Sequence, residues 1–261
     1  MKTSMLLATL VLVSAFATPA CTVGDPDGDA VIGDGLAADQ PDDDGGIGTI
    51  AARVCAATET TKGIDVSYYQ GTIDWAQVKN AGYEYAFVRL SDGSTFRDPK
   101  FARNWAGTKA AGVVRGAYQF FRPSQSATVQ ADMMIAAMAD FQPGDLPPVI
   151  DVEATGGMSA KNIAARVRIW TDRVEAALGV KPIVYTGKYF WRDQVGGPTD
   201  FADHPLWVAQ YTSLCPDLPA PWTTWTFWQY SDKGRIPGIK DDVDTNRFNG
   251  TLDDLRAFAN Q

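Results

Sequence analysis

The sequence has very few of the residues that most often bind metals or activate nucleophiles. Its 261 residues include a single histidine, His204, and three cysteines, Cys21, Cys55 and Cys215. No Cys/His spacing is typical of a zinc site, and Ser-His-Asp or Cys-His chemistry would have to use His204. His204 is followed by Pro205 and an apolar run, which favours a structural role. We therefore expect neither a metal ion nor a cofactor.

The sequence also lacks a surplus of basic residues. Its 23 lysines and arginines stand against 31 aspartates and glutamates, for a net charge of -8. A protein that binds nucleic acid mainly through its phosphates needs the opposite balance, so we expect no nucleic-acid partner. Most of the acidity lies in residues 22–57, which contain eight aspartates and one arginine.

The N-terminal region has the pattern of an export signal followed by a tether. Residues 1–20 combine Lys2, an apolar stretch and small residues ending at Ala20, which is typical of a signal peptide. Cys21 follows directly, so the mature chain is expected to be either a lipoprotein anchored there or an ordinary secreted protein. Residues 21–57, rich in Asp and Gly, predict a flexible acidic linker. Residues 58–261 predict one barrel domain, which acts outside the cytoplasm as a monomer.

Cys55 and Cys215 remain once Cys21 is assigned to the anchor. In an oxidising compartment the two could pair, which would tie the segment before the domain to a late loop. Two free thiols are an equal alternative, because the sequence gives no distance between them.

Strands and helices alternate through the domain. Apolar runs predict strands over 63–67, 83–90, 113–121, 146–153, 182–186, 206–211, 225–230 and 243–248, and capped segments predict helices over 75–81, 101–111, 124–140, 159–178 and 251–259. This alternation favours parallel pairing, and eight strands favour a closed barrel. The connections after 186, 211 and 230 are too short or irregular for full helices. The expected fold class is α/β, an incomplete TIM-like barrel with eight strands and fewer than eight helices.

Two carboxylates end the fourth predicted strand, in the segment LPPVIDVEATG. Asp151 and Glu153 are two residues apart, and residues i and i+2 of a strand point to the same face. When two carboxylates lie this close together, their repulsion raises the pKa of at least one of them, which keeps that acid protonated near neutral pH. An isolated Asp-x-Glu pair is more often two solvent-exposed acids that lead into a loop. Whether this pair forms a site therefore depends on the residues at the ends of the other strands.

Acids, amides and rings recur at the ends of the other predicted strands. The active residues of a βα barrel lie at the C-terminal rim of its strands. This rim adds two acids, Asp65 and Asp244, and a set of rings and amides: Tyr68, Tyr118, Gln119, Tyr185, Trp207, Gln210, Tyr211, Gln229 and Asn246. Core packing explains any single ring, but the coincidence at strand ends favours a carbohydrate site. There, rings would stack on sugars, and carboxylates and amides would bind hydroxyls.

Six segments then follow one another in a specific order. They are GIDVSYYQGTIDW (63–75), FVRLSDGSTFRDPKFARNWAGTKAAGVVRGAYQFFRP (87–123), PPVIDVEATG (147–156), PIVYTGKYFW (182–191), PLWVAQY (205–211) and WQYSDKGRIPGIKDDVDTNRFNG (228–250). Together they resemble glycoside hydrolase family 25, the lysozymes of the Chalaropsis type, over about residues 62–259. The resemblance implies an incomplete barrel and a lysozyme (N-acetylmuramidase) activity, which cleaves peptidoglycan at the β-1,4 bond from N-acetylmuramic acid to N-acetylglucosamine.

The resemblance also implies a role for each matching residue. Glu153 is expected to be the general acid, and Asp151 its partner near the 2-acetamido group of the substrate. Asp65 and Asp244 are expected to be the further acids of the site. The expected sugar contacts are Tyr118, Tyr185, Trp207 and Gln210, with Tyr68 and Gln119 beside them. Gln119 stands where the family often has a histidine, and a glutamine does not titrate near neutral pH.

Two routes and two other functions stay open at this stage. After protonation by Glu153, either the substrate's own N-acetyl oxygen attacks with Asp151 steadying it, or Asp65 or Asp244 activates a water. The paired acids on one wall favour the first, substrate-assisted route. A chitinase-like or other hexosaminidase barrel would share the acids and rings, and a barrel that only binds glycan is the third alternative.

Overall fold

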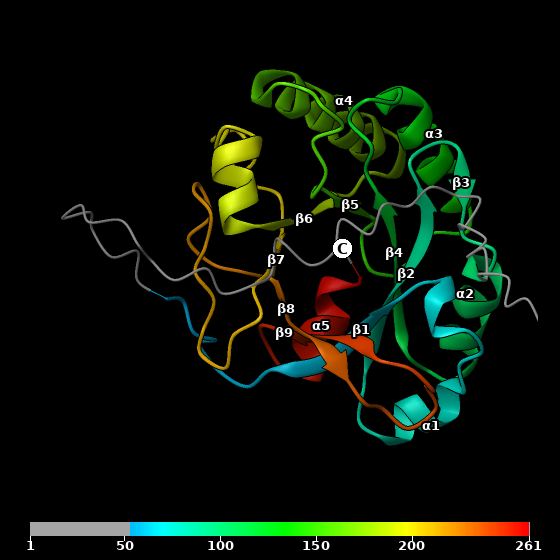
Figure 1. Cartoon of the computed structure of the whole chain (residues 1–261). Coiled ribbons are helices and arrows are strands. Elements are labelled where there is room, and N and C mark those ends of the chain that lie inside the picture. The colour runs from blue at the N-terminus through cyan, green and yellow to red at the C-terminus, as the bar shows by residue number, and fades with distance from the viewer. Residues whose placement is uncertain (1–52, 261) are drawn as a thin grey trace, which may run out of the picture. The chain divides into compact units, whose positions relative to one another are not determined.

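The structure is a computed structural model that describes residues 53–260 (Figure 1). The predicted signal peptide, Cys21 and all but the last residues of the predicted linker lie outside the described residues. Within the described part, no helix combines the length and the apolar content needed to cross a membrane.

Eight strands close into a barrel around the centre of the domain. Their order is β1-β9-β8-β7-β6-β5-β4-β2, and a further pairing of β1 with β2 closes the ring. A two-residue strand, β3, pairs only with the outer end of β2. The strands are β1 Thr61–Val66, β2 Tyr85–Asp92, β3 Phe96–Arg97, β4 Val114–Phe120, β5 Val149–Asp151, β6 Ile183–Gly187, β7 Leu206–Ala209, β8 Phe227–Gly234 and β9 Val243–Phe248. The predicted barrel of eight strands is therefore confirmed.

The last strand departs from the all-parallel barrel that the alternation predicts. Going round the barrel from β1 through β2, β4, β5, β6 and β7 to β8, each strand is parallel to the next. In contrast, β9 runs antiparallel to both β8 and β1. Only residues 235–242 join β8 to β9, and a parallel crossover needs a dozen or more residues. The short connection therefore forces the chain to turn back.

The helices cover the first half of the barrel and thin out in the second, as predicted. A π-helical turn, Phe190–Gln194, replaces a full helix between β6 and β7, and no helix joins β7 to β8. Helices α3 and α4 pack side by side along the outer surface (Figure 1). The helices are α1 Trp75–Asn80, α2 Phe101–Ala110, α3 Ala127–Ala137, α4 Ala160–Leu178 and α5 Leu252–Phe258.

Local capping explains where these helices begin and end. Asp74 caps α1 by accepting a hydrogen bond from the backbone N–H of Gln77. Ser126, rather than the predicted Ser124, caps α3, and its hydroxyl accepts from Val129. Gly179 ends α4 in the left-handed conformation, with φ 73°, which costs glycine no Cβ clash.

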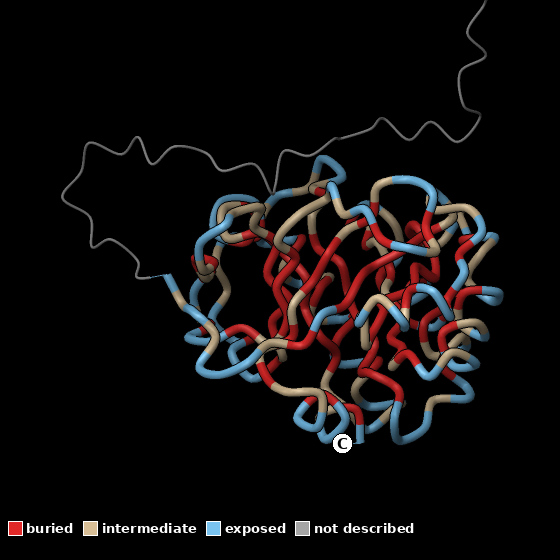
Figure 2. The backbone as a smooth tube through the Cα atoms, turned by 90° about the horizontal axis from the view of Figure 1, so that it is seen from below, coloured by how far each residue is buried: buried red, intermediate tan, exposed pale blue. Residues whose placement is uncertain are grey.

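Period-two alternation divides the apolar residues into an inner and an outer core. The inner core fills the barrel with large rings, including those of Tyr85, Phe87, Trp207 and Phe227, and α5 adds Leu255. The outer core packs the opposite faces of the strands against the helices. Figure 2 shows buried backbone through the centre of the domain, with exposed segments around its edge. The inner rings make the barrel a packed support for whatever lies at its rim.

A disulfide joins the start of the domain to the loop between β7 and β8. Cys55 and Cys215 are bonded, with Cα atoms 4.8 Å apart, which settles the pairing that the sequence left open. Beside it, the Val54 N–H donates to the carbonyl of Pro216 at 2.9 Å. The indole of Trp225 donates to the carbonyl of Val54 at 2.7 Å. These bonds fix residues 54–55 against the second half of the barrel, where helices are few.

We expect the double variant Cys55→Ser, Cys215→Ser to lose about 2–5 kcal/mol of unfolding free energy, because the bond constrains the unfolded chain. The cysteines are 160 residues apart, which places the effect toward the upper end of that range. Denaturant unfolding of the variant, compared with oxidised and reduced wild type, measures the loss. An unchanged unfolding midpoint would contradict this role for the disulfide.

Candidate active site

Four carboxylates converge at one rim of the barrel. Asp65 lies near the C-terminal end of β1, Asp151 ends β5, and Glu153 follows two residues later. Asp244 lies at the start of β9, and the antiparallel direction of β9 brings that end to the same rim. Asp65 and Asp244 are directly opposite each other in the β1–β9 pairing. Directly opposed side chains have Cβ atoms about 5 Å apart, so these two acids are immediate neighbours.

Asp151 and Glu153 share the side of β5 that faces the barrel interior. Val149 belongs to the inner core, whereas Ile150 and Val152 belong to the outer core. Alternation therefore places Asp151 inward, and Glu153 follows on the same side. The strand itself ends at Asp151, two residues earlier than the sequence predicts. Asp151 is 5% exposed, while Glu153 is only half-buried.

Asp65 is held by a network of side chains that spans five strands. Its Oδ2 accepts hydrogen bonds from Asn246 Nδ2 at 2.7 Å and from Gln229 Nε2 at 3.0 Å. The Tyr185 hydroxyl donates to Gln229 Oε1 at 2.8 Å, and the Trp207 indole donates to Asn246 Oδ1 at 2.8 Å. Each amide is oriented by its ring partner so that its NH2 group faces the carboxylate. The network therefore stabilises Asp65 as an ionised acceptor.

Burial and like charge raise the pKa values of the three aspartates among these acids. The pKa of Asp151 is raised well above 3.8, chiefly by burial and then by the charge of Glu153. The pKa of Asp244 is also raised well above 3.8, by burial, by the charge of Asp65 and by a hydrogen bond with it. Burial raises the pKa of Asp65 too, although the bonds from Asn246 and Gln229 oppose it. Asp244 is thus the member of its pair that holds a proton.

Three tyrosines surround these acids. Burial raises the pKa of Tyr118, Tyr185 and Tyr211, and the charges of nearby acids, Asp65 among them, add to the shift. All three phenols therefore stay protonated and can donate hydrogen bonds. Tyr211, whose hydroxyl lies 3.4 Å from Gln229 Oε1, is among the residues that the sequence places at the rim, although the resemblance assigned it no sugar contact.

The structure does not bring the two predicted glutamines to this cluster. Tyr118 faces inward, so Gln119 faces outward, where it is fully buried. Its amide bonds the Ser91 hydroxyl at 2.8 Å and accepts from the Trp170 indole at 2.7 Å. Gln210 is taken up by the β7–β8 loop, where its Oε1 accepts from the backbone N–H of Asp217 at 2.6 Å. Both glutamines alternate with inward residues, which explains their positions.

Two of the four predicted aromatic contacts, Trp207 and Tyr68, lie at different depths. Trp207 is 1% exposed and stacks on Phe87 with ring centroids 4.4 Å apart, so it forms the floor beneath the acids. Tyr68 lies at the outer rim, where the centroid of its ring is 4.2 Å from that of Tyr69. Gln229 and Asn246, which the sequence places at the rim without assigning them a role, prove to be the direct partners of Asp65.

Metal chemistry finds no support in the described part of the chain. Among residues 53–260, no group of three or more His, Cys, Asp or Glu side chains is placed to hold a metal ion. His204 is 2% exposed, and its Nδ1 lies 2.9 Å from the carbonyl oxygen of Pro182, as suits the structural role predicted for it.

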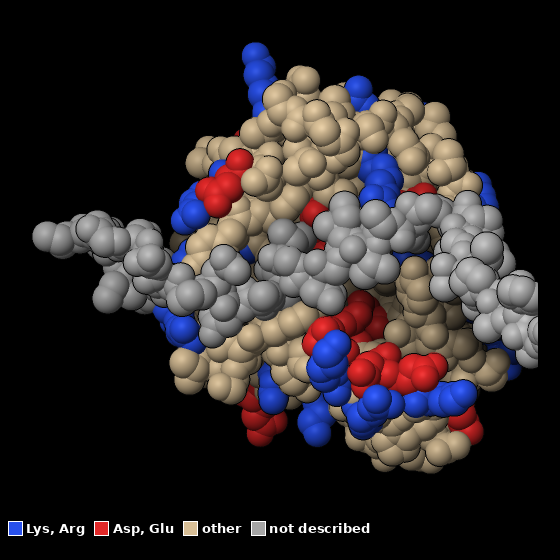
Figure 3. Space-filling view, in the orientation of Figure 1, with Lys and Arg blue, Asp and Glu red and all other residues tan. Residues whose placement is uncertain are grey.

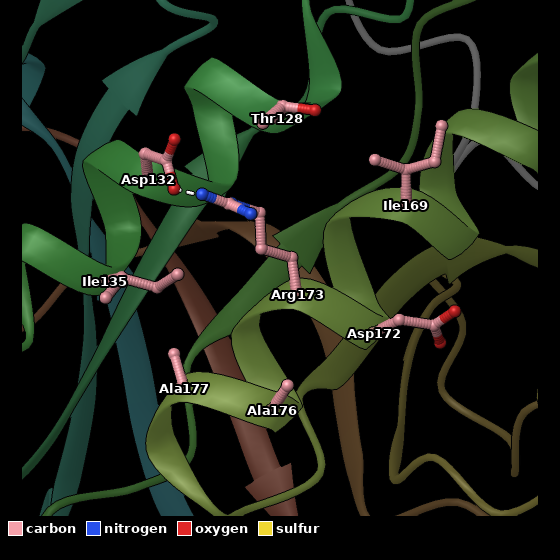
Figure 4. A pocket seen from close by; sticks show the side chains of 8 residues that line it. All are labelled: Thr128, Asp132, Ile135, Ile169, Asp172, Arg173, Ala176 and Ala177. Carbon is pink, nitrogen blue, oxygen red and sulfur yellow. Dashed lines mark hydrogen bonds and ion pairs between the residues drawn. The ribbon is translucent and has the colours of Figure 1, made fainter.

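Figure 3 shows acidic side chains grouped on one face of the domain, with basic side chains beside them. A hollow lies between the outer surfaces of α3 and α4 (Figure 4). An ion pair between Asp132 and Arg173 crosses it at 2.6 Å, and the rest is lined by Thr128, Ile135, Ile169, Asp172, Ala176 and Ala177. It contains none of the four rim acids.

Comparisons with known proteins point to the same family as the motifs. The profile described as "Glycosyl hydrolases family 25" matches residues 64–239. The uncharacterised protein YegX of Escherichia coli K12 is 42% identical over 208 residues, covering 78% of this chain and 75% of that protein. Lysozyme M1 of Streptomyces globisporus is 36% identical over 215 residues, covering 78% of this chain and 73% of that protein.

The fold gives an independent comparison. The crystal structure of the bacterial lysozyme from Streptomyces coelicolor superposes with a TM-score of 0.72 at 34% identity, covering 78% of this chain and 98% of that chain. Sequence, fold and the convergence of acids at the barrel rim agree. The chain therefore belongs to glycosyl hydrolases family 25 and is a glycoside hydrolase.

Proposed function

We propose that this protein is a lysozyme that hydrolyses the β-1,4 bond between N-acetylmuramic acid and N-acetylglucosamine in peptidoglycan. The observation that carries the proposal is the convergence of four acids, on three strands and the residues after them, above a floor of rings. Family membership supplies the substrate class. Peptidoglycan lies outside the cytoplasm, so the protein acts there. Residues 1–20 direct its export, and the mature protein is either secreted or anchored through lipid on Cys21. It acts as a monomer.

Glu153 is the general acid in this proposal. It follows the end of β5, is half-buried, and stands beside the buried Asp151, so it can reach the oxygen of the leaving sugar. Its proton goes to the glycosidic oxygen as the bond to the anomeric carbon breaks. A positioned acid of this kind contributes about 10²–10⁴ to the rate.

Asp151 and the Asp65–Asp244 pair have different tasks. Asp151 is on the same wall as Glu153, so it orients the 2-acetamido group, whose carbonyl oxygen attacks the anomeric carbon. Asp65 accepts bonds from two amides and one acid, which fixes it as a structural anion. The protonated Asp244 donates to Asp65 and borders the substrate. This arrangement favours the substrate-assisted route over activation of water by Asp65 or Asp244.

Replacement of Glu153 by Gln should abolish hydrolysis while leaving glycan binding largely intact, because the amide keeps the shape but has no proton to give. We expect the rate to fall by at least about 10²-fold. Loss of turbidity of purified cell walls and release of reducing ends measure it, with chitin oligomers as a second substrate. Glu175→Gln, on the outside of α4, is the control. A Glu153→Gln protein that clears walls at the wild-type rate would remove Glu153 from this role.

The substrate-assisted route predicts retention of configuration. Proton NMR of the first product formed should show the β anomer, which then mutarotates. An initial α anomer would mean that water attacks directly, and Asp65 or Asp244 would have to serve as the base.

The Asp244→Asn variant should be more stable than wild type at neutral pH and less active. Because the pKa of Asp244 is raised, the folded protein keeps a proton that the unfolded chain releases above 3.8. The stability that this group provides is therefore complete below that pH and is lost as the pH rises through the folded pKa. Asparagine removes this dependence and still donates to Asp65.

Thermal unfolding from acidic to neutral pH measures the effect, and a gain of 1 kcal/mol would raise Tm by about 2–4 °C. Asp253→Asn, at an exposed position on α5, is the control and should change neither Tm nor activity. A Tm difference between variant and wild type that stays constant across this pH range would contradict the shared proton.

A further inference from the structure

Two buried arginine–aspartate pairs on neighbouring strands differ in one respect. Arg89 is 7% exposed and Arg115 is 5% exposed. Arg115, on the outer face of β4, uses all three of its guanidinium nitrogens, on both oxygens of Asp145 and on the carbonyl of Trp105. Arg89 bonds Asp98 through Nε at 3.1 Å, but its buried Nη2 has no hydrogen-bond partner among the described residues.

The position of Arg89 places it at the acid site. It follows Tyr85 and Phe87 at spacings of two on β2, and both of those rings belong to the inner core. It pairs with Tyr118 on β4, just before a bulge that shifts the register of β2. Bulges often re-aim side chains beside active sites. The charge of Arg89 also lowers the pKa values of Tyr118 and Asp151, in keeping with this position.

The surroundings of Arg89 hold it still. The central carbon of its guanidinium, Cζ, lies 5.1 Å from the centroid of the Tyr68 ring. The ring centroids of Tyr69 and Phe96 lie 5.4 and 5.6 Å from the same atom. The backbone N–H of Tyr68 also donates to Asp98, so the ion pair and the rings form one unit. A guanidinium fixed in this way offers its remaining N–H at little entropic cost.

In the described part of the chain, Asp151 has a hydrogen-bond acceptor that lacks a donor, whereas Arg89 has a donor that lacks an acceptor. Its Oδ1 is buried and has no hydrogen-bond partner among the described residues, in contrast to the doubly bonded Oδ2 of Asp65. Asp151 pairs with Phe120 on β4, two residues beyond the Tyr118 that pairs with Arg89. Strands β2 and β5 flank β4, and strands two apart lie about 10 Å from each other. The donor Arg89 Nη2 and the acceptor Asp151 Oδ1 therefore lie on either side of Tyr118 at the same rim of the barrel.

Buried polar groups are normally satisfied, and each exception calls for an explanation. A secondary amide satisfies both exceptions at once, since its carbonyl accepts from Arg89 and its N–H donates to Asp151. The substrate proposed above carries such an amide at carbon 2 of each sugar. A free amine at the same carbon would be a cation beside the Arg89 guanidinium, with no acceptor for Nη2.

We propose that Arg89 determines the specificity of this enzyme for N-acetylated over N-deacetylated glycan, by donating from Nη2 to the acetamido carbonyl while Asp151 Oδ1 accepts the acetamido N–H. This inference rests on the proposed lysozyme function and deepens it. The ionised Asp65 would otherwise attract a cationic amino sugar. Arg89 opposes that attraction at the one position where the two glycans differ.

Binding tests the proposal without relying on turnover. The ligands are a tetrasaccharide of alternating N-acetylglucosamine and N-acetylmuramic acid, and its N-deacetylated counterpart at a pH where the amines are protonated. Calorimetry gives both Kd values in a Glu153→Gln background. We expect the acetylated ligand to bind at least about tenfold more tightly, as for one hydrogen bond to a charged group. Adding Arg89→Met should reduce that ratio to about one or below.

The second arginine pair supplies the matched control. Arg115→Met breaks an equally buried ion pair on the outer face of β4, so it should lower stability and leave the Kd ratio unchanged. Arg89→Lys keeps the charge and a partner for Asp98 but loses the second nitrogen. We expect this milder variant to fold and to bind the acetylated ligand at least about threefold more weakly.

Three results would overturn the proposal: equal binding of the two ligands in the Glu153→Gln background, an unchanged ratio in a folded Arg89→Met or Arg89→Lys protein, or the same loss in Arg115→Met. Failure of the lysozyme function itself would show differently. It would show as wild-type protein that releases no disaccharide from the acetylated tetrasaccharide, which mass spectrometry detects. The two failures are therefore distinguishable.

Discussion

The site depends on the cross-strand pair of Asp65 and Asp244. The antiparallel return of β9 closes the barrel and sets these two acids directly opposite each other. Two carboxylates at that distance cannot both ionise without a large repulsion, so one keeps a proton. The amides of Gln229 and Asn246 select Asp65 as the ionised partner. The closure of the barrel thus decides a protonation state as well as a topology.

The inner core supports this layer of polar groups. Below the acids, the barrel is filled by rings that pack at close range, such as Trp207 with Phe87 and Tyr185. Rings with an N–H or O–H end serve both purposes, because Trp207 and Tyr185 pack with their faces and orient the two amides with their polar ends. Packing and hydrogen bonding are therefore coupled, and repacking the floor would disturb the acids above it.

The polar groups of the rim fall into two classes. The groups around Asp65 are satisfied within the protein, which makes them a fixed electrostatic frame. Arg89 and Asp151 each keep one buried atom without a partner among the described residues. Unsatisfied atoms lower the stability of the protein alone, and a site that binds a substrate amide recovers that loss on binding. Stability in the rest of the domain, including the disulfide and the outer core, offsets the cost.

The sequence by itself determined the family, the eight strands, the shortage of helices in the second half and the grouping of Asp65, Asp151, Glu153 and Asp244, because strand periodicity and ordered motifs are local features. Only the tertiary structure decided the antiparallel direction of β9, the outward turn of Gln119 and the partners of Asp65. A one-residue change of register moves a side chain to the other face of a strand, and cross-strand partners come from distant parts of the chain. Those contacts depend on how the barrel closes, and no stretch of sequence contains that information.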